Sequence, residues 1–149
     1  MSQVEPHLKA QVWVFSPGIQ GEEVLLLKTQ PARGGGWQPI TGSIEPGESP
    51  EAGALRELFE ETGLRVAPAD LVDTGFEFEF ESRWGGMARE RVWACHVGLS
   101  EEEKRSIRLD STEHQGFCWT DLRQAEILLE HASAKKALFL ADKCIRKKI

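Results

Sequence analysis

Long apolar runs are missing from this sequence. No segment approaches the roughly 18 consecutive apolar residues that a membrane-spanning helix requires, and no early segment joins a basic start to an apolar run, as an export signal does. We therefore expect a soluble protein in the cytoplasm, with no membrane partner.

Cysteine is also scarce. The only three are Cys95, Cys118 and Cys144, an odd number without the close spacing of metal-ligating cysteines. This pattern disfavours both a disulfide framework and a zinc site built on thiolates. We expect reduced thiols that pack in the core.

Positive charge is in deficit, with 18 Lys and Arg residues against 24 Asp and Glu residues and a net charge of −6. Broad nucleic-acid binding draws on Lys and Arg to displace phosphate counterions, so the deficit argues against it, except for a contact with an RNA 5′ end. A phosphate-bearing substrate remains compatible with an acidic protein if divalent cations supply the missing charge.

The length of 149 residues and the 40% hydrophobic content suit one globular domain, residues 1–149. Period-2 alternation, β-branched and aromatic content, and Gly and Pro in the flanks predict strands at 8–15, 22–29, 37–40, 75–82, 88–99 and 116–119. Helical patterns predict helices at 50–62, after a cap at Thr120 or Asp121, and at 132–148, whereas 100–106 is expected to be a solvated connection. The fold class is α/β, a mixed sheet with a central helix and a C-terminal helix.

Glutamates crowd the stretch from Gly42 to Leu64. Ser49 and Pro50 are typical of a helix start, and Gly63 is typical of a helix end. At 100° per residue, three glutamates of this helix share one arc of about 100°, and three apolar residues gather opposite to them. The acidic set is Glu57, Glu60 and Glu61, and the apolar set, which we expect to pack on the sheet, is Ala52, Leu55 and Phe59.

A trio of helical carboxylates most often forms a solubilising surface. Hard divalent cations such as Mg²⁺, however, prefer oxygen ligands and are commonly shared between a few carboxylates and substrate phosphates. Arg56 lies one helical turn before Glu60, where its guanidinium can orient a carboxylate. The helix therefore has the composition of a metal site for a phosphate substrate.

The fixed positions of this stretch resemble the complete signature of the Nudix hydrolases. Gly42 is followed after five residues by Glu48, and after seven more by Arg56, Glu57, Leu58, Glu60, Glu61, Gly63 and Leu64. Membership would imply an α/β/α sandwich and hydrolysis, dependent on Mg²⁺ or Mn²⁺, of a phosphoanhydride bond in a nucleoside diphosphate linked to another group.

The resemblance also assigns roles to individual residues. Glu57, Glu60 and Glu61 would be metal ligands and catalytic residues, together with the carbonyl of Gly42, while Glu48 and catalytic Arg56 would support and orient them. Many members use a further carboxylate outside the signature as a base or ligand, and the candidate here is Glu113; a loop glutamate with no special role is the alternative. We expect the neighbouring His114 to be a loop or substrate-shaping residue.

The substrate stays open at this stage. The stretches "WQPITGSIEPGE", "FEFE" and "TEH" are similar to dihydroneopterin triphosphate pyrophosphatases, which also accept dATP and release pyrophosphate. The stretches "EHQGFCW" and "AKKALFLADKCI" resemble the asymmetrical diadenosine tetraphosphate hydrolases, and an RNA 5′ pyrophosphohydrolase is a third alternative. Trp37, Trp84 and Phe76 are candidates to stack on a purine or pterin ring, and Arg33, Arg83 and Arg89 to bind distal phosphates.

A function of another class is a Nudix fold that senses a nucleotide without catalysis. The presence of Arg56 and all three signature carboxylates favours an enzyme, because a pure binding module has no chemical need for the whole set. The sequence leaves the oligomeric state open.

Overall fold

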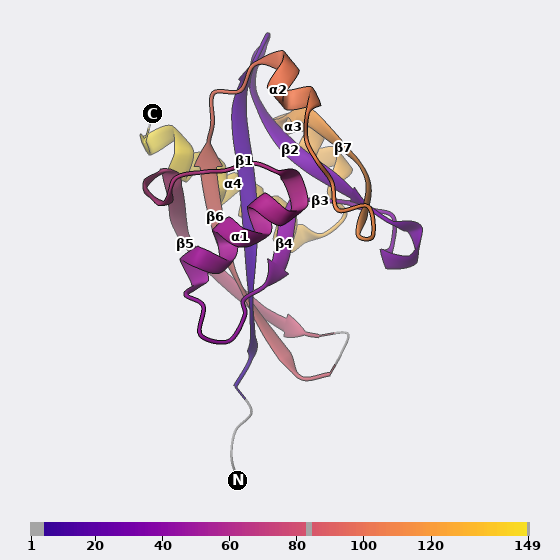
Figure 1. Ribbon diagram of the computed structural model, residues 1–149, viewed down its shortest axis with the longest axis vertical. Coiled ribbons are helices and arrows are strands. Elements are labelled where there is room, and N and C mark those ends of the chain that lie inside the picture. Colours follow the sequence, from indigo (N-terminus) through magenta and orange to yellow (C-terminus); the bar gives the residue numbers. More distant parts are fainter. Residues whose placement is uncertain (1–4, 83–84, 149) are drawn as a thin grey trace.

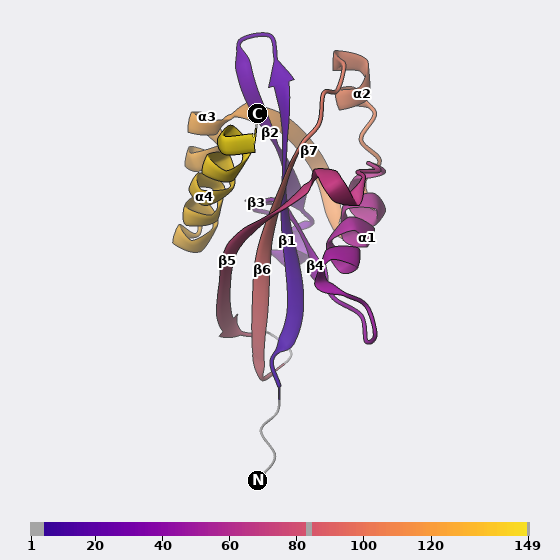
Figure 2. The same cartoon turned by 90° about the vertical axis from the view of Figure 1, so that its left-hand side faces the viewer.

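The computed structural model describes residues 5–82 and 85–148, and it has a mixed β-sheet between two layers of helix (Figures 1 and 2). The main path of the sheet runs β3-β2-β1-β6-β5, while β4 pairs with β1 and β7 pairs with β2. The strands are β1 His7–Gly18, β2 Gly21–Thr29, β3 Trp37–Gln38, β4 Ile40–Ser43, β5 Leu71–Glu81, β6 Met87–His96 and β7 His114–Asp121.

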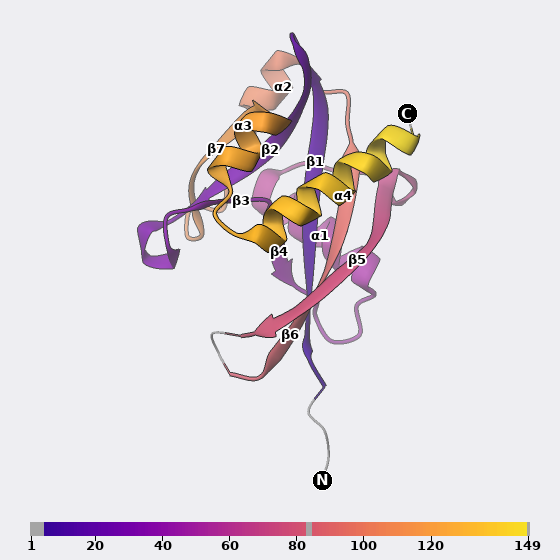
Figure 3. The same ribbon diagram turned by 180° about the vertical axis from the view of Figure 1, so that it is seen from behind.

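Helices cover the two faces of the sheet unequally. On one face α1 (Pro50–Thr62) lies against β1 and β4, with the short α2 (Glu101–Arg105) above it. On the other face α4 (Ala132–Lys148) crosses β5 and β6 diagonally, and α3 (Leu122–Leu128) packs on β2 and β7 (Figure 3). Two short 3₁₀ segments, η1 (Pro31–Arg33) and η2 (Pro68–Asp70), complete the elements. This arrangement is the α/β sandwich that the sequence predicts.

The centre of the sheet is β1, which pairs antiparallel with β2 and β4 and parallel with β6. The β1–β2 hairpin closes with Gly18 opposite Gly21, at the predicted turn. Successive side chains of β1 point to opposite faces of the sheet and pack into two separate cores. Ala10, Val12 and Val14 pack under α1, whereas Trp13 and Phe15 pack under α3 and α4.

The ends of α1 lie where the sequence places them. The Ser49 hydroxyl accepts a hydrogen bond from the Ala52 N–H at 3.1 Å, and Pro50 fills the first turn, where its missing N–H costs nothing. Gly63 ends the helix at φ +80°, a left-handed conformation that favours glycine, and its N–H donates to the Phe59 carbonyl at 2.8 Å.

The predicted packing face of α1 was wrong at Ala52 and Phe59, although Leu55 does pack against the core. Ala52 is exposed, Phe59 is 38% exposed beneath Arg65, and Leu55 is only partly buried. The buried residues of the helix are Gly53, Ala54, Leu58, Glu61 and Thr62. Ala54 and Leu58 sit on the sheet, and this rotation turns Glu61 inward beside them. The pattern of apolar residues did not reveal this orientation of the helix, because its buried side also carries Glu61, whose carboxylate lines a cavity.

The segment 100–106 is more structured than expected. It contains α2, whose first turn is closed by a reciprocal capping box between Ser100 and Glu103. Lys104 is 2% exposed, and its ammonium donates to the Pro17 carbonyl at 2.6 Å and to Glu23 at 2.8 Å. This buried ion pair fixes α2 to the β1–β2 hairpin, a long-range contact without a local signal in the sequence.

Other elements match their patterns closely. Along β5, Phe76, Phe78 and Phe80 are partly buried and the intervening glutamates are exposed, while α4 spans the predicted residues. Asp121 caps α3 by accepting a hydrogen bond from the Gln124 N–H at 2.8 Å. No helix within 5–82 and 85–148 is long and apolar enough to cross a membrane.

Candidate active site

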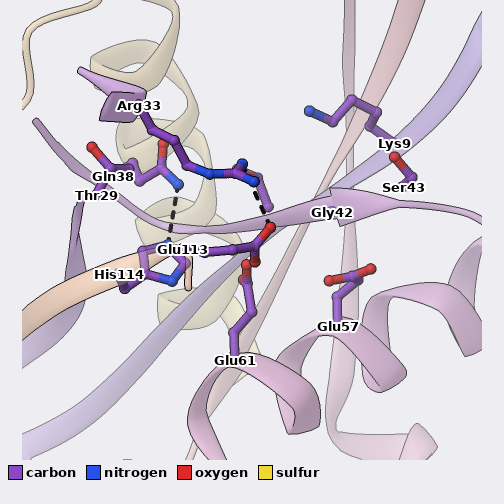
Figure 4. Close-up of a pocket in the computed structure, with 11 residues that line it drawn as sticks. Lys9, Thr29, Arg33, Gln38, Gly42, Ser43, Glu57, Glu61, Glu113 and His114 are labelled. Carbon is purple, nitrogen blue, oxygen red and sulfur yellow. Dashed lines mark hydrogen bonds and ion pairs between the residues drawn. The ribbon is translucent and has the colours of Figure 1, made fainter. Parts of the chain in front are cut away.

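A polar cavity of about 420 Å³ opens where the C-terminal half of α1 faces the edge of the sheet (Figure 4). Three carboxylates line it. Glu57 and Glu61 belong to α1, and Glu113 is the residue immediately before β7. Two cations, Lys9 and Arg33, also line it, and in Figure 4 their charged ends lie on the same side of this acidic group. The remaining lining residues are polar or small: Thr29, Gln38, Thr41, Gly42, Ser43 and His114.

The carboxylate of Glu57 lies directly against Gly42 of β4. A Cβ on Gly42 would meet the carboxyl carbon and an oxygen of Glu57 at less than van der Waals contact. Burial raises the pKa of Glu57, and this effect is opposed by hydrogen bonding to Arg56 and by its charge. Glycine at this position therefore makes room for the acid while keeping the strand paired, with Gly42 opposite Ala10 of β1.

Glu61 is the most deeply buried acid of the site, at 2% exposure. Burial, followed by hydrogen bonding to Glu113 and the charges of Glu113 and Glu57, raises the pKa of Glu61 to about 10, against a smaller lowering by the backbone at Thr41. Its Oε2 atom has no hydrogen-bond partner among the described residues. A buried carboxylate oxygen without a donor is costly, so this atom is positioned for a ligand.

Glu113 lies in a tight turn just before β7, and its carboxylate reaches the side chain of Glu61. Its N–H donates to the Asp110 carbonyl at 3.1 Å, and its own carbonyl accepts from the Gln30 N–H at 3.0 Å. Its carboxylate forms an ion pair with Arg33 at 3.5 Å. The structure therefore brings the carboxylate outside the signature beside Glu61, although 52 positions separate them in the chain.

His114 follows Glu113 directly and is 2% exposed. Its Nε2 lies 3.4 Å from the side-chain nitrogen of Gln38, and its Nδ1 has no hydrogen-bond partner in the described part of the chain. Burial lowers the pKa of His114, and the charges of Glu113 and Asp110 oppose that effect. One ligand atom each of Glu61, Glu113 and His114 lie within 4.8 Å of one another.

Arg56 organises the acids beside the cavity. Its Nε and one terminal nitrogen donate to both oxygens of Glu48 at 2.8 and 3.0 Å, and its other terminal nitrogen donates to Glu57 at 2.9 Å and to Glu60 at 3.1 Å. It also donates to the Ser43 carbonyl at 2.8 Å. Hydrogen bonding to Arg56 lowers the pKa of Glu48 to about 2. This fork of fixed donors joins the helix to the loop before it and to β4.

Some predicted site residues lie away from the cavity. Glu60 is exposed, pairs with Arg56 at 3.1 Å, and is not among the residues that line the cavity. Trp37 packs against the core under α3 and α4, with Lys28 5.7 Å from its ring centroid. Phe76 belongs to the same core, and Arg89 pairs with Glu79 at 2.8 Å. Trp84 and Arg83 lie outside the described residues.

Sequence reasoning missed Lys9 and Gln38 as residues of the site, and it gave His114 no ligand role. Lys9 is in β1, at the point where β1 pairs with Ser43 of β4, and Gln38 is in the short β3. Neither carries a motif of its own. The one available signal was closeness in the sequence, since Gln38 lies shortly before the acidic stretch and His114 follows Glu113.

The donor set fits a hard divalent cation. Three carboxylates converge on one cavity, and two buried atoms, Glu61 Oε2 and His114 Nδ1, lack partners among the described residues. A hard divalent cation prefers the oxygen donors that the three carboxylates supply, and its charge would compensate negative charges that otherwise repel one another. The residues present therefore suit a metal ion.

Comparisons with known proteins point to one family. A family model described as the NUDIX domain matches residues 6–142. A dihydroneopterin triphosphate diphosphatase of Haemophilus influenzae is 34% identical over 95 residues, which are 60% of each chain. An asymmetrical bis(5′-nucleosyl)-tetraphosphatase of Mus musculus is 30% identical over 103 residues, which are 68% of this chain and 67% of the relative.

An octanoyltransferase of Myxococcus xanthus is 42% identical over 105 residues, which are 68% of this chain but only 27% of that protein. Because the match spans about a quarter of that relative, its named activity does not carry over. Among solved structures, a binary complex of the Ap4A hydrolase of C. elegans superposes with a TM-score of 0.77 at 21% identity, covering 95% of this chain and 98% of the other. At that identity the likeness shows a shared fold.

Proposed function

Because the chain belongs to the Nudix family, we propose that it is a divalent-metal-dependent hydrolase that cleaves a phosphoanhydride bond in a small nucleotide-like substrate. The observation that carries this proposal is the convergence of Glu57, Glu61 and Glu113 on one polar cavity, flanked by Lys9 and Arg33. Carboxylates that can hold a cation and basic side chains that can bind phosphate therefore line the same cavity, which suits metal-assisted phosphate chemistry.

The acidic residues would hold the cation. Glu57 and Glu61, which line the cavity, would be carboxylate ligands, with the Gly42 carbonyl and Glu60 as further oxygen donors. Mg²⁺ or Mn²⁺ bound there would act as a Lewis acid that lowers the pKa of a water and neutralises phosphate oxygens. Arg56 and Glu48 position these carboxylates through the hydrogen bonds described above.

Glu113 is our candidate for the group that accepts the proton of the attacking water. It is partly buried beside Glu61, and its backbone is fixed by hydrogen bonds to Gln30 and Asp110. A carboxylate held at the metal site by a rigid turn can act as a general base or as a further ligand.

Lys9 and Arg33 would bind the phosphates. In Figure 4 the charged ends of both side chains lie on the same side of the acidic group, and Arg33 forms an ion pair with Glu113 at 3.5 Å. Phosphates bound at the site would contact these two cations. Two neighbouring cations suit a polyphosphate, whose charge is spread over several phosphates, better than a phosphomonoester.

For the substrate we favour dihydroneopterin triphosphate or dATP, cleaved to a monophosphate and pyrophosphate. The Haemophilus influenzae relative, named for the pterin compound, supports this choice. Dinucleoside tetraphosphates are the second candidate. They are supported by the name of the mouse relative and by the "EHQ" stretch, whose Glu113 and His114 line the cavity. An RNA 5′ end is the least favoured, because the net charge is −6. Trp84 remains a candidate for stacking on the ring of the substrate.

Metal removal tests the proposed chemistry. Hydrolysis of dATP in Mg²⁺ should fall at least a hundredfold in excess chelator and return when Mg²⁺ exceeds the chelator, because the carboxylates alone repel phosphate. The measurement is the rate of pyrophosphate release under the three conditions. Full turnover in chelator would contradict a metal-dependent site. Nucleotide binding without any turnover in Mg²⁺, Mn²⁺ or Co²⁺ would support the sensing alternative.

A further inference from the structure

One part of the cavity differs chemically from the rest, because it contains a nitrogen donor. There the imidazole of His114 stands beside two carboxylates, those of Glu61 and Glu113. The three ligand atoms lie within 4.8 Å of one another. Donors on opposite sides of an octahedral ion with bonds of about 2.1 Å are about 4.2 Å apart, so a small side-chain rotation would let all three contact one ion.

Two atoms of this group are buried without a partner. Glu61 Oε2 and His114 Nδ1 each belong to a side chain that is 2% exposed, and neither has a hydrogen-bond partner in residues 5–82 and 85–148. A buried polar atom without a partner lowers the stability of the folded state. Two such atoms facing one space would both be satisfied by a single cation, whereas an ordinary core histidine would have both ring nitrogens paired.

The imidazole is held in place by its backbone. The His114 N–H donates to the Asp110 carbonyl at 2.9 Å, and the His114 carbonyl accepts from the Gln30 side chain at 3.1 Å. The residue pairs with Thr29 at the irregular start of the β2–β7 ladder. In Figure 4 the ring nitrogen that does not contact Gln38 is on the side of the carboxylates.

Gln38 can fix the tautomer that metal binding needs. Coordination through Nδ1 requires a proton on Nε2, and a metal-bound histidine usually donates that proton to an oxygen acceptor. Gln38 stands 3.4 Å from Nε2 through its amide nitrogen, and a turn of the amide places its oxygen there instead. The side chain next to the ring can therefore accept the Nε2 proton.

We propose that His114 Nδ1 is a direct metal ligand, shared with Glu61 and Glu113, and that it gives this site a preference for Co²⁺ over Mg²⁺. The proposal rests on the proposed function, since it concerns the same cavity. Imidazole binds Co²⁺ and the later transition metals better than it binds Mg²⁺, which favours oxygen donors and retained waters. One nitrogen donor in an oxygen site shifts selectivity in that direction.

Pulsed electron paramagnetic resonance of the Mn²⁺-loaded protein tests the contact directly. We expect nitrogen modulation from a coordinated imidazole in the parent protein and in His131→Ala, which removes an exposed histidine. The modulation should be lost in His114→Ala. A parent protein without nitrogen modulation, or a His114→Ala protein that retains it, would overturn the proposal.

Calorimetric titration supplies a second readout that does not depend on turnover. His114→Ala should weaken Co²⁺ binding at least tenfold and Mg²⁺ binding less than threefold, with an unchanged circular dichroism spectrum. Equal losses for both ions would contradict a nitrogen ligand. If Mn²⁺ binds and hydrolysis proceeds without nitrogen modulation, this inference fails alone. If no divalent cation binds to the parent protein, the proposed function fails with it.

Discussion

Replacing Glu61 with glutamine is expected to lower kcat by roughly 10²- to 10⁴-fold. The substitution keeps the size and helix propensity of the residue but removes the negative charge from the deepest carboxylate of the cavity. If Glu61 holds the cation, the site loses both metal affinity and the geometry that orients the attacking water. Glu51→Gln is the matched control, because Glu51 is an exposed glutamate of the same helix and its loss should leave kcat within a factor of two.

The same variant should be more stable than the parent when metal is absent. The pKa of Glu61 is raised from 4.5 to about 10 in the folded protein. Stability linked to this group is therefore complete below pH 4.5, where both states are protonated, and declines as the pH rises toward 10. At pH 7 the parent should be less stable than Glu61→Gln by on the order of 2 kcal/mol, or several degrees in Tm.

Thermal melting in chelator from pH 4.5 to 9 measures this difference. The gap between Glu61→Gln and the parent should be small at pH 4.5 and should widen as the pH rises. A variant that is less stable than the parent at neutral pH, or that turns over dATP at a near-normal rate, would assign Glu61 to a structural ion pair instead of a metal site.

Replacing Gly42 with alanine is expected to lower kcat roughly 10²-fold, because displacing a catalytic group by about 1 Å has an effect of that size. The added Cβ would occupy the space of the Glu57 carboxyl group, so Glu57 must move away from Arg56 and the cavity. Only the acid is displaced, since the backbone at Gly42 has no left-handed conformation to lose.

Gly116→Ala is the control for this substitution. Gly116 lies in β7, and a Cβ there has nothing within 4 Å. Its kcat should stay within a factor of two of the parent. A Gly42→Ala protein with normal kcat and normal metal affinity would show that the position of the Glu57 carboxylate does not matter to the reaction.

Much of the helical framework of the site could be read from the sequence. The Ser49–Pro50 start and the Gly63 end of α1 were predicted to the residue, because capping depends on local chemistry. The spacing of the family signature likewise identified Glu57 and Glu61, which line the cavity, together with Glu60, which does not. Such features depend on neighbours within a few positions, where one sequence carries full information.

Long-range contacts could not be predicted. The rotation of α1 that buries Glu61 depends on how Ala54 and Leu58 sit on β1 and β4, and the approach of Lys9 depends on the β1–β4 register. Trp37, whose ring seemed suited to a planar substrate, instead packs in the core under α3 and α4. Each outcome is decided by strand pairing or packing between distant segments, which periodicity does not encode.

The central claim is that this cavity hydrolyses a phosphoanhydride bond. Its most direct test is chromatography of the products after incubation with Mg²⁺ and, separately, dihydroneopterin triphosphate, dATP, diadenosine tetraphosphate and a nucleoside monophosphate. We predict a monophosphate and pyrophosphate from at least one triphosphate, or unequal nucleotide fragments from the tetraphosphate, and no reaction of the monophosphate. Release of inorganic phosphate from the monophosphate, with every anhydride intact, would contradict the account.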